Sequence, residues 1–145
     1  MKTGSEFTCT TQVTPSNCAS AVGSGGLDVF ATPSMIALME QAAYTLVQGS
    51  MAEGESTVGT QMNVDHVKAS KIGDTITAKA VLTAIDGRKL TFEVSATDSA
   101  GNTSTMVKDI TFKQFPAMYV YADTNESFYD HDSDTDDGDD YYDQN

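Results

Sequence analysis

The sequence predicts an α+β fold in which a long central helix is wrapped by an antiparallel sheet of about five strands. Three observations support this prediction. Residues 32–48 are apolar or small on nearly every side, apolar and polar residues alternate at period two between residues 58 and 112, and Asp86-Gly87 is a strong hairpin signal. A helix without a wide polar face is usually buried by structure that curves around it.

The first strand is predicted within residues 4–14, where three residues recur at period two: Phe7, Cys9 and Val13. A loop is expected over residues 15–28, and it ends in the run Gly23-Ser24-Gly25-Gly26. This run lacks the lysine and the spacing of a phosphate-binding loop, so a lid or a plain connector is the favoured interpretation.

The central helix is expected to begin at Thr32-Pro33 and to end at Gly49. Threonine is a good N-cap because its hydroxyl accepts a backbone N–H, and proline is tolerated at the first helical position. We therefore predict that Thr32 caps the helix.

Four antiparallel strands are expected after the helix. Gly73-Asp74 turns the chain after the first of them, and hairpins at Asp86-Gly87 and at residues 99–102 join the others. The helix-facing side of the first strand is expected to carry Val58, Thr60, Met62, Val64 and His66. One antiparallel sheet around one apolar helix is the hot-dog arrangement. Because its core is small and its sheet has open edges, we expect a homodimer or a dimer of dimers.

The net charge of −13 is unevenly distributed along the chain. Residues 122–145 contain ten of the 21 acidic residues and no Lys or Arg, so residues 1–121 carry a net charge of only −3. We expect one hot-dog domain over residues 1–121 and an acidic, disordered tail over residues 122–145. The tail lacks the spacing and the closing glutamate of an EF-hand, so we expect no metal site there.

No stretch approaches the roughly 20 apolar residues of a membrane span, and the N-terminus lacks the apolar region of a secretory signal. Cys9 and Cys18 are too few for a disulfide framework or a zinc site, and we interpret them as reduced thiols. We therefore expect a cytoplasmic protein that has no cofactor and binds neither nucleic acid nor a membrane.

Three polar residues do not suit a plain core. Glu40 must be paired, protonated or directed into a cavity, because burying an unpaired carboxylate is costly; a glutamate bonded to a backbone amide at a dimer seam is the alternative. His66 falls on the helix-facing side of its strand, where a satisfied core histidine is the simpler interpretation of that residue alone. Capping alone explains Thr32, although the free N–H groups and the positive dipole end beside it form a ready site for an oxyanion.

Taken together, these three residues suggest chemistry. Thr32 and Glu40 lie eight residues apart in the sequence, which is about 12 Å along a helix at about 1.5 Å per residue. An imidazole between them could bridge this gap. Hydroxyl, imidazole and carboxylate in this order are the logic of an activated nucleophile with an oriented base, whether the histidine belongs to the same chain or to a partner.

Three runs of the chain carry a family resemblance: VFATPSMIALMEQA, GESTVGTQMNVDHVKASKIGDTITAKAVL and DGRKLTFEVSATDSAG. They resemble the hot-dog acyl-CoA thioesterases akin to fluoroacetyl-CoA thioesterase. The resemblance implies hydrolysis of an acyl-CoA thioester in a dimer, with Thr32, Glu40 and His66 as the catalytic set and Gly59 shaping the site. Two routes stay open. Either Thr32 or a water attacks, with His66 as base and Glu40 orienting it, or Glu40 itself activates the water or attacks the acyl carbon.

Two departures from the family bear on the substrate. The run Gly23-Ser24-Gly25-Gly26 stands where fluoroacetyl-CoA thioesterase has aromatic lid residues, which argues against fluoroacetyl-CoA as the substrate. Met106 and Lys108 stand where relatives often carry the histidine and the arginine of a G-T-H-E-R run. Lysine keeps the charge of arginine but loses its planar fork, so we expect affinity or specificity to differ if this residue binds an anionic group.

Binding of CoA phosphates needs local positive charge, because residues 1–121 are nearly neutral. The candidate contacts are Lys68, Lys71, Arg88, Lys89 and Lys108, and ordinary solvated side chains are the alternative interpretation.

The leading hypothesis is an acyl-CoA thioesterase that hydrolyses a small or medium acyl-CoA. The alternative is a non-catalytic hot-dog module that binds CoA esters or a protein partner, and the altered Lys108 region and the acidic tail motivate it. A hydratase on the same fold is less favoured, because its motif generally pairs Asp and His on the central helix, and this helix contains no histidine.

Overall fold

The computed structural model describes residues 1–102 with their side chains and the backbone of residues 105–116. Five strands and two α-helices make up this part of the chain, with a short 3-10 turn before the first helix. In chain order they are β1 (Glu6–Gln12), the 3-10 turn (Pro15–Asn17), α1 (Ala19–Val22), α2 (Thr32–Gln48), β2 (Glu55–His66), β3 (Thr75–Asp86), β4 (Lys89–Thr97) and β5 (Thr105–Pro116). The acidic segment 122–145 lies outside the described residues, as does the end of the expected domain.

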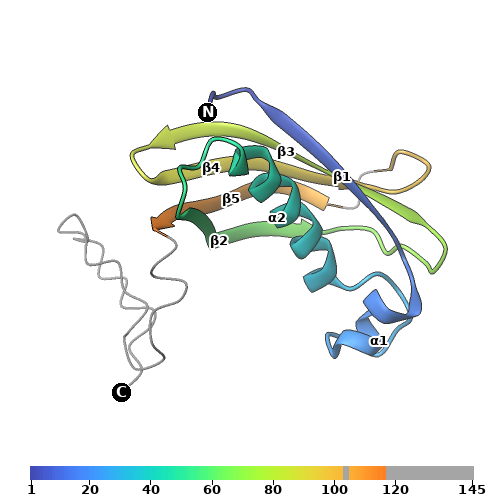
Figure 1. The fold of residues 1–145 in the computed structure, drawn as a ribbon. Coiled ribbons are helices and arrows are strands. Elements are labelled where there is room, and N and C mark those ends of the chain that lie inside the picture. The colour runs from blue at the N-terminus through green and yellow to red at the C-terminus, as the bar shows by residue number, and fades with distance from the viewer. Residues whose placement is uncertain (103–104, 117–145) are drawn as a thin grey trace, which may run out of the picture.

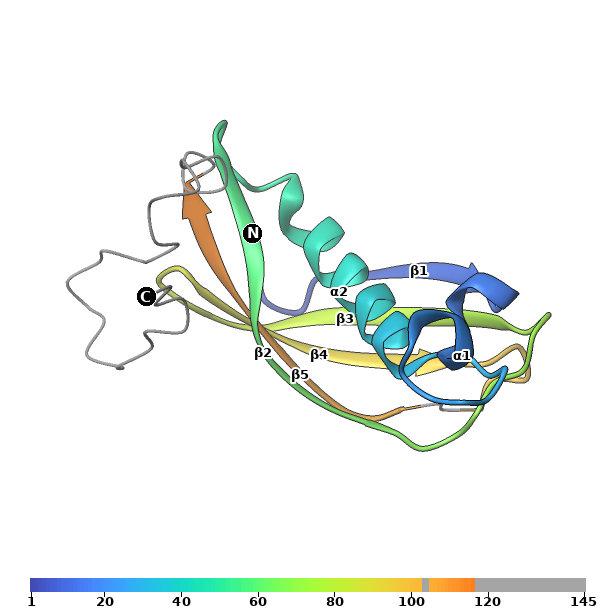
Figure 2. The same cartoon turned by 90° about the horizontal axis from the view of Figure 1, so that it is seen from below.

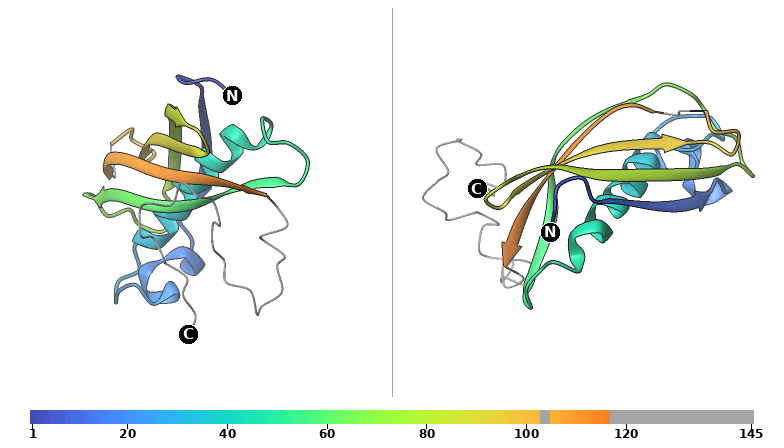
Figure 3. Two further views of the ribbon diagram at one scale, coloured as in Figure 1. Left: turned by 90° about the vertical axis from the view of Figure 1, so that its left-hand side faces the viewer. Right: turned by 90° about the horizontal axis from the view of Figure 1, so that it is seen from above.

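The strands form one antiparallel sheet in the order β1-β3-β4-β5-β2. Helix α2 crosses one face of this sheet, and α1 lies beside the first turn of α2 (Figures 1 and 2). Figure 3 shows that the sheet is twisted, so that β2 and the end of β5 turn toward the helix side while the β3–β4 hairpin projects beyond them. The predicted hot-dog fold is therefore confirmed. Strand β2 follows α2 in the chain but pairs with β5 instead of β3.

The core lies between one face of α2 and the alternating inner residues of β3 and β4. Helix α2 contributes Met35, Leu38, Met39, Ala42, Ala43 and Val47, and all of them are buried. The two strands contribute Ile76, Ala78, Ala80 and Leu82, and Leu90, Phe92, Val94 and Ala96. The predicted period-two alternation holds in both strands. The alanines leave room for the helix to lie close to the sheet.

The opposite side of α2 is exposed in the single chain. Pro33, Ala37 and Gln41 lie on it, and Tyr44 is 39% exposed. The expectation of a helix covered on every side is therefore met on one face only, because the sheet, through β1, β2, β3 and β4, covers one side of α2.

Strand β2 has a bulge that the period-two pattern does not reveal. Gly59 pairs with Phe112 and Gln61 pairs with Thr111, so Thr60 is an extra residue between them. An extra residue reverses the side on which the preceding residues point. As a result Thr57 is buried and Thr60 is exposed, whereas Met62 and Val64 pack against the core. The predicted placement of Thr60 on the helix-facing side is wrong for this reason.

The expected loop over residues 15–28 contains the 3-10 turn and α1. The Asn17 side chain stabilises this region, since its Oδ1 accepts from the Thr14 backbone N–H at 2.8 Å and its Nδ2 donates to the Gln12 carbonyl at 2.9 Å. Four residues of α1 are too few to show a helical period, which is why the sequence pattern did not predict it. Within the described residues, no helix is long and apolar enough to cross a membrane.

Candidate active site

Thr32 and His66 meet where the start of α2 lies over the end of β2. The Thr32 Oγ1 atom lies 2.9 Å from His66 Nδ1, which is a hydrogen bond. Ala31, in extended conformation, is the N-cap of α2, and its carbonyl accepts the Met35 N–H at 2.9 Å. The predicted capping role of Thr32 is therefore wrong. Because the helix begins one residue earlier than the pattern indicated, the hydroxyl is available to the imidazole.

His66 is half-buried, and desolvation lowers the pKa of its imidazole below the ordinary 6.5, while a backbone hydrogen bond with Lys68 acts in the opposite direction. The ring is therefore neutral at pH 7. Its Nε2 atom is buried and has no hydrogen-bond partner in the described part of the chain. A neutral ring with one nitrogen on the threonine can hold or accept a proton at this position.

A cavity of about 220 Å³ opens beside this pair. The helix start, the α1 region and residues 66–69 line it, and Ser24 of the glycine-rich run is among the lining residues. Ser24 therefore brings the run beside the Thr32–His66 site.

Glu40 lies two turns further along α2 and lines a second, larger cavity of about 490 Å³ between α2 and β2. The side chain is half-buried, and burial raises the pKa of its carboxyl above the ordinary 4.5. No hydrogen bond or ion pair to this carboxylate is present among the described residues. Of the three states expected for a buried acid, the structure shows a carboxylate that lines a cavity.

Gly59 and Thr57 line the same cavity as Glu40. The bulge at Thr60 places both beside α2. Thr57 is 8% exposed, and its hydroxyl oxygen is buried without a hydrogen-bond partner. A buried hydroxyl left without a partner costs about 1–3 kcal/mol, so a ligand or water is expected to satisfy it. The sequence did not single out Thr57, because the predicted alternation began at Val58 and, extended by one residue, would place Thr57 on the outer face.

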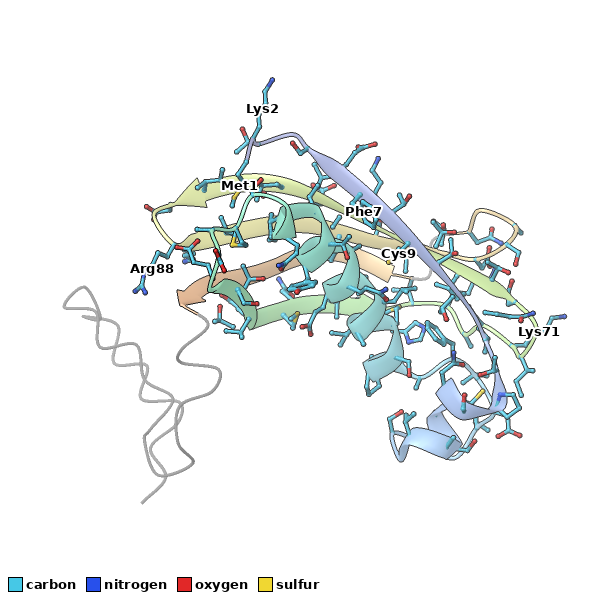
Figure 4. All side chains as sticks on the ribbon, viewed as in Figure 1. Met1, Lys2, Phe7, Cys9, Lys71 and Arg88 are labelled. Carbon is cyan, nitrogen blue, oxygen red and sulfur yellow. The ribbon has the colours of Figure 1, made fainter. Side chains whose placement is uncertain are left out.

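The structure separates the candidate phosphate contacts. Figure 4 shows Lys71 and Arg88 at opposite ends of the sheet. Lys71 is exposed and forms an isolated β-bridge with Val29, which lines the Thr32–His66 cavity. Lys68 lines that cavity too, but its ammonium is bound to Asp98.

The other two candidates lie away from the Thr32–His66 cavity or outside the described side chains. Lys89 begins β4, next to Arg88 in the β3–β4 hairpin. The backbone of Lys108 pairs with Val64, and its side chain lies outside the described part.

Comparison with known proteins assigns the chain to a family. The model of the family described as fluoroacetyl-CoA-specific thioesterase, FlK, matches residues 13–109, which include Thr32, Glu40, Gly59 and His66. The chain belongs to this family. The resemblance expected from the sequence is confirmed.

Individual members of the FlK family agree with this assignment. Fluoroacetyl-CoA thioesterase from Streptantibioticus cattleyicolor is 39% identical over 71 residues, which are 49% of this chain and 51% of that protein. The alignment therefore spans about half the length of this relative.

Solved structures of FlK superpose over most of the chain. One, which addresses the activity and substrate specificity of the enzyme, matches with a TM-score of 0.78 and 27% identity, over 84% of this chain and 93% of that one. A threonine-to-serine variant of FlK in complex with acetyl-CoA matches with a TM-score of 0.77 and 26% identity, over 84% and 95% of the two chains.

Proposed function

We propose that this protein hydrolyses the thioester of a small or medium acyl-CoA to the free acid and CoA. The observation that carries the proposal is the 2.9 Å contact between Thr32 and His66 at the start of α2, with the cavity-lining carboxylate of Glu40 two turns away on the same helix. Membership of the FlK family supports the same activity.

The positions of the three side chains favour the route in which Glu40 acts as the base that activates a water. Eight residues correspond to a rotation of only about 80° around a helix, so Thr32 and Glu40 lie on the same side of α2. Side chains on a helix lean toward its N-terminus, which brings the carboxylate closer to the Thr32–His66 pair. The route requires the thioester carbonyl and one water to lie between the Thr32–His66 cavity and the Glu40 cavity.

In this route Glu40 accepts a proton from the water as the water oxygen bonds to the carbonyl carbon. The carbonyl oxygen becomes an oxyanion, and the Thr32 hydroxyl and the free N–H groups at the start of α2 stabilise it. His66 orients Thr32 through Nδ1. The C–S bond then breaks, and the CoA thiolate takes up the proton that Glu40 carries.

A panel of acyl-CoA esters of increasing chain length tests the proposed activity. Purified protein is expected to release free CoA from short and medium esters faster than buffer does, which a thiol reagent measures. Acyl-CoA binding by calorimetry without any hydrolysis would instead support the non-catalytic module. The absence of both binding and turnover would contradict the proposal.

Lys71 is proposed as a contact for the CoA phosphates. Its side chain is exposed near the Thr32–His66 cavity, and no described residue forms an ion pair with it. Lys71→Ala is expected to raise KM about two- to fivefold without changing kcat, since an exposed ion pair contributes about 0.2–1 kcal/mol. The effect should shrink in high salt.

Lys89→Ala is the matched control for Lys71→Ala. It removes the same charge from the opposite end of the sheet, and it should leave KM unchanged. Equal effects of the two substitutions on KM would show that the overall charge of the protein, and not a local contact of Lys71, determines the affinity for acyl-CoA.

We further propose that the protein is a cytoplasmic homodimer with one hot-dog domain over residues 1–121. The exposed side of α2 and the position of β2 at the sheet edge support a dimer, because a second copy would cover both. Light scattering after gel filtration measures the mass, and a monomer at micromolar concentration would contradict this assembly.

A further inference from the structure

Asp98, in the β4–β5 turn, is a buried carboxylate that accepts hydrogen bonds at both of its oxygens. Its Oδ1 accepts from the backbone N–H groups of Ala100 at 3.0 Å and Asn102 at 2.8 Å. Its Oδ2 accepts from Asn102 Nδ2 at 3.2 Å and from the Lys68 ammonium at 2.5 Å. The hydrogen bond from Lys68 is the main reason why the pKa of Asp98 is held at about 2, with further contributions from Asn102.

Lys68 belongs to the segment that follows His66. The β4–β5 turn and the connection from β2 to β3 lie at the same end of the sheet (Figure 1). Two contacts fix this segment beyond His66, where β2 ends. The Ser70 carbonyl accepts the Phe30 N–H at 2.8 Å, and the Lys68 side chain reaches Asp98. Val67 and Ala69, on either side of Lys68, are exposed and line the Thr32–His66 cavity.

Lys68 follows His66 by two residues, and the segment from His66 to Ala69 lines one cavity together with Thr32. A shift of this segment would therefore move the ring relative to Thr32. We propose that the Lys68–Asp98 ion pair is a positioning device that holds His66 against Thr32. As a statement about catalysis, this rests on the proposed thioesterase function.

The proposal gives Lys68 a different task from the one its charge suggested. Its ammonium is neutralised by a carboxylate whose side chain is only 5% exposed. A lysine engaged in this way lacks the free charge that a CoA phosphate needs. Loss of the pair should consequently lower kcat and leave KM for acyl-CoA unchanged, whereas loss of a phosphate contact would raise KM.

Three single variants and one double variant test the pair. Lys68→Met removes the charge and keeps the length of the side chain, and Asp98→Asn keeps an acceptor for the Ala100 and Asn102 N–H groups. Each is expected to lower kcat about 10- to 100-fold, as small displacements of a reacting group do. The double variant should be no worse than the worse single variant, because the two residues act as one unit. Lys68→Arg keeps the ion pair and should retain most of the wild-type kcat.

Asp74→Asn is the matched control. Asp74, just before β3, accepts hydrogen bonds from Ser99, the residue that follows Asp98, but it forms no hydrogen bond or ion pair with Lys68. It should leave kcat unchanged, and circular dichroism should show that all variants are folded. A fall in kcat for Asp74→Asn equal to that for Asp98→Asn would show that the turn as a whole matters and would overturn the proposal.

The second readout does not depend on turnover. NMR titration of the His66 ring, assigned with a His131→Gln variant, should show its pKa moving toward the ordinary 6.5 in Lys68→Met and Asp98→Asn, because a released ring gains water. Unchanged ring resonances in folded variants would refute the positioning role, as would a raised KM with normal kcat. If the wild type hydrolyses no acyl-CoA, the proposed function fails, and the titration still decides whether the pair positions His66.

Discussion

Replacing Glu40 with glutamine is expected to lower kcat about 10²- to 10⁴-fold, which is the usual contribution of a general base. The same substitution should make the protein more stable at neutral pH. Burial raises the pKa of the Glu40 carboxyl above 4.5, so its ionised form is less favourable in the folded chain than in the unfolded one. The stability that this group provides is therefore present below pH 4.5 and is lost as pH rises through the raised pKa. Glutamine removes that cost.

Two measurements test both halves of this expectation. Melting temperatures at pH 7 should be higher for Glu40→Gln than for the wild type, and the difference should disappear near pH 4. Glu93→Gln is the control, because Glu93 is an exposed carboxylate on β4 between two buried residues and therefore faces away from α2. It should change neither kcat nor the melting temperature. A Glu40→Gln protein that melts lower and keeps its activity would identify Glu40 as a structural residue.

The pH dependence of kcat/KM should follow the same carboxyl group. As a base Glu40 must be ionised, so activity should fall on the acid side with an apparent pKa above 4.5. The residual activity of Glu40→Gln should lack this limb. If the acid limb persists in that variant, His66, whose pKa lies below 6.5, is the group responsible.

Removing the hydroxyl of Thr32 is expected to lower kcat about 10²- to 10³-fold, as the loss of an oxyanion donor does. Thr32→Val keeps the shape of the side chain and removes the 2.9 Å contact with His66 Nδ1, whereas Thr32→Ser keeps it. Serine should therefore stay within about tenfold of the wild type, because the same hydroxyl group remains. Because Thr32 is exposed and does not cap α2, the valine variant should melt within a few degrees of the wild type.

His66→Asn should resemble Thr32→Val in kcat, and the double variant should be no worse than either, since the two side chains act through one hydrogen bond. Rapid quenching and mass spectrometry distinguish the competing route. An acyl group trapped on Thr32 in the wild type would show that the hydroxyl attacks the thioester directly, which would overturn the water route. In the double variant, a loss of kcat equal to the product of the two single losses would show that Thr32 and His66 do not act as a unit.

The sequence predicted the main elements well where a regular period or a turn residue was present. The alternation in β3 and β4 located their inner residues, and Asp86-Gly87 located their hairpin because Gly87 adopts a positive φ of 57°. In β2 the alternation held for Met62 and Val64 but failed at Thr60, and Gly59 is the residue type there that could have indicated a bulge. The pairing of β2 with β5 is a non-local contact that local patterns do not encode.

In the candidate site, too, the features that follow from local patterns were predicted and those that depend on non-local contacts were not. Thr32 and His66 could be predicted as a pair, because the sequence located the helix and the strand that carry them. Both residues also stand out because they are polar residues in an apolar setting. Thr57 was missed because its burial depends on the bulge. The engagement of Lys68 by Asp98 joins two turns that are 30 residues apart, so only the folded chain reveals it.

The alanines beneath α2 have a consequence for how substrate preference can change in this scaffold. Ala78, Ala80 and Ala96 set the height at which the helix rests on the sheet, and Glu40 travels with the helix. A bulkier residue at any of the three would lift α2 and widen the groove between it and β2. On the proposed function, acyl-chain preference is thus set partly from underneath, by residues that line neither the Glu40 cavity nor the Thr32–His66 cavity.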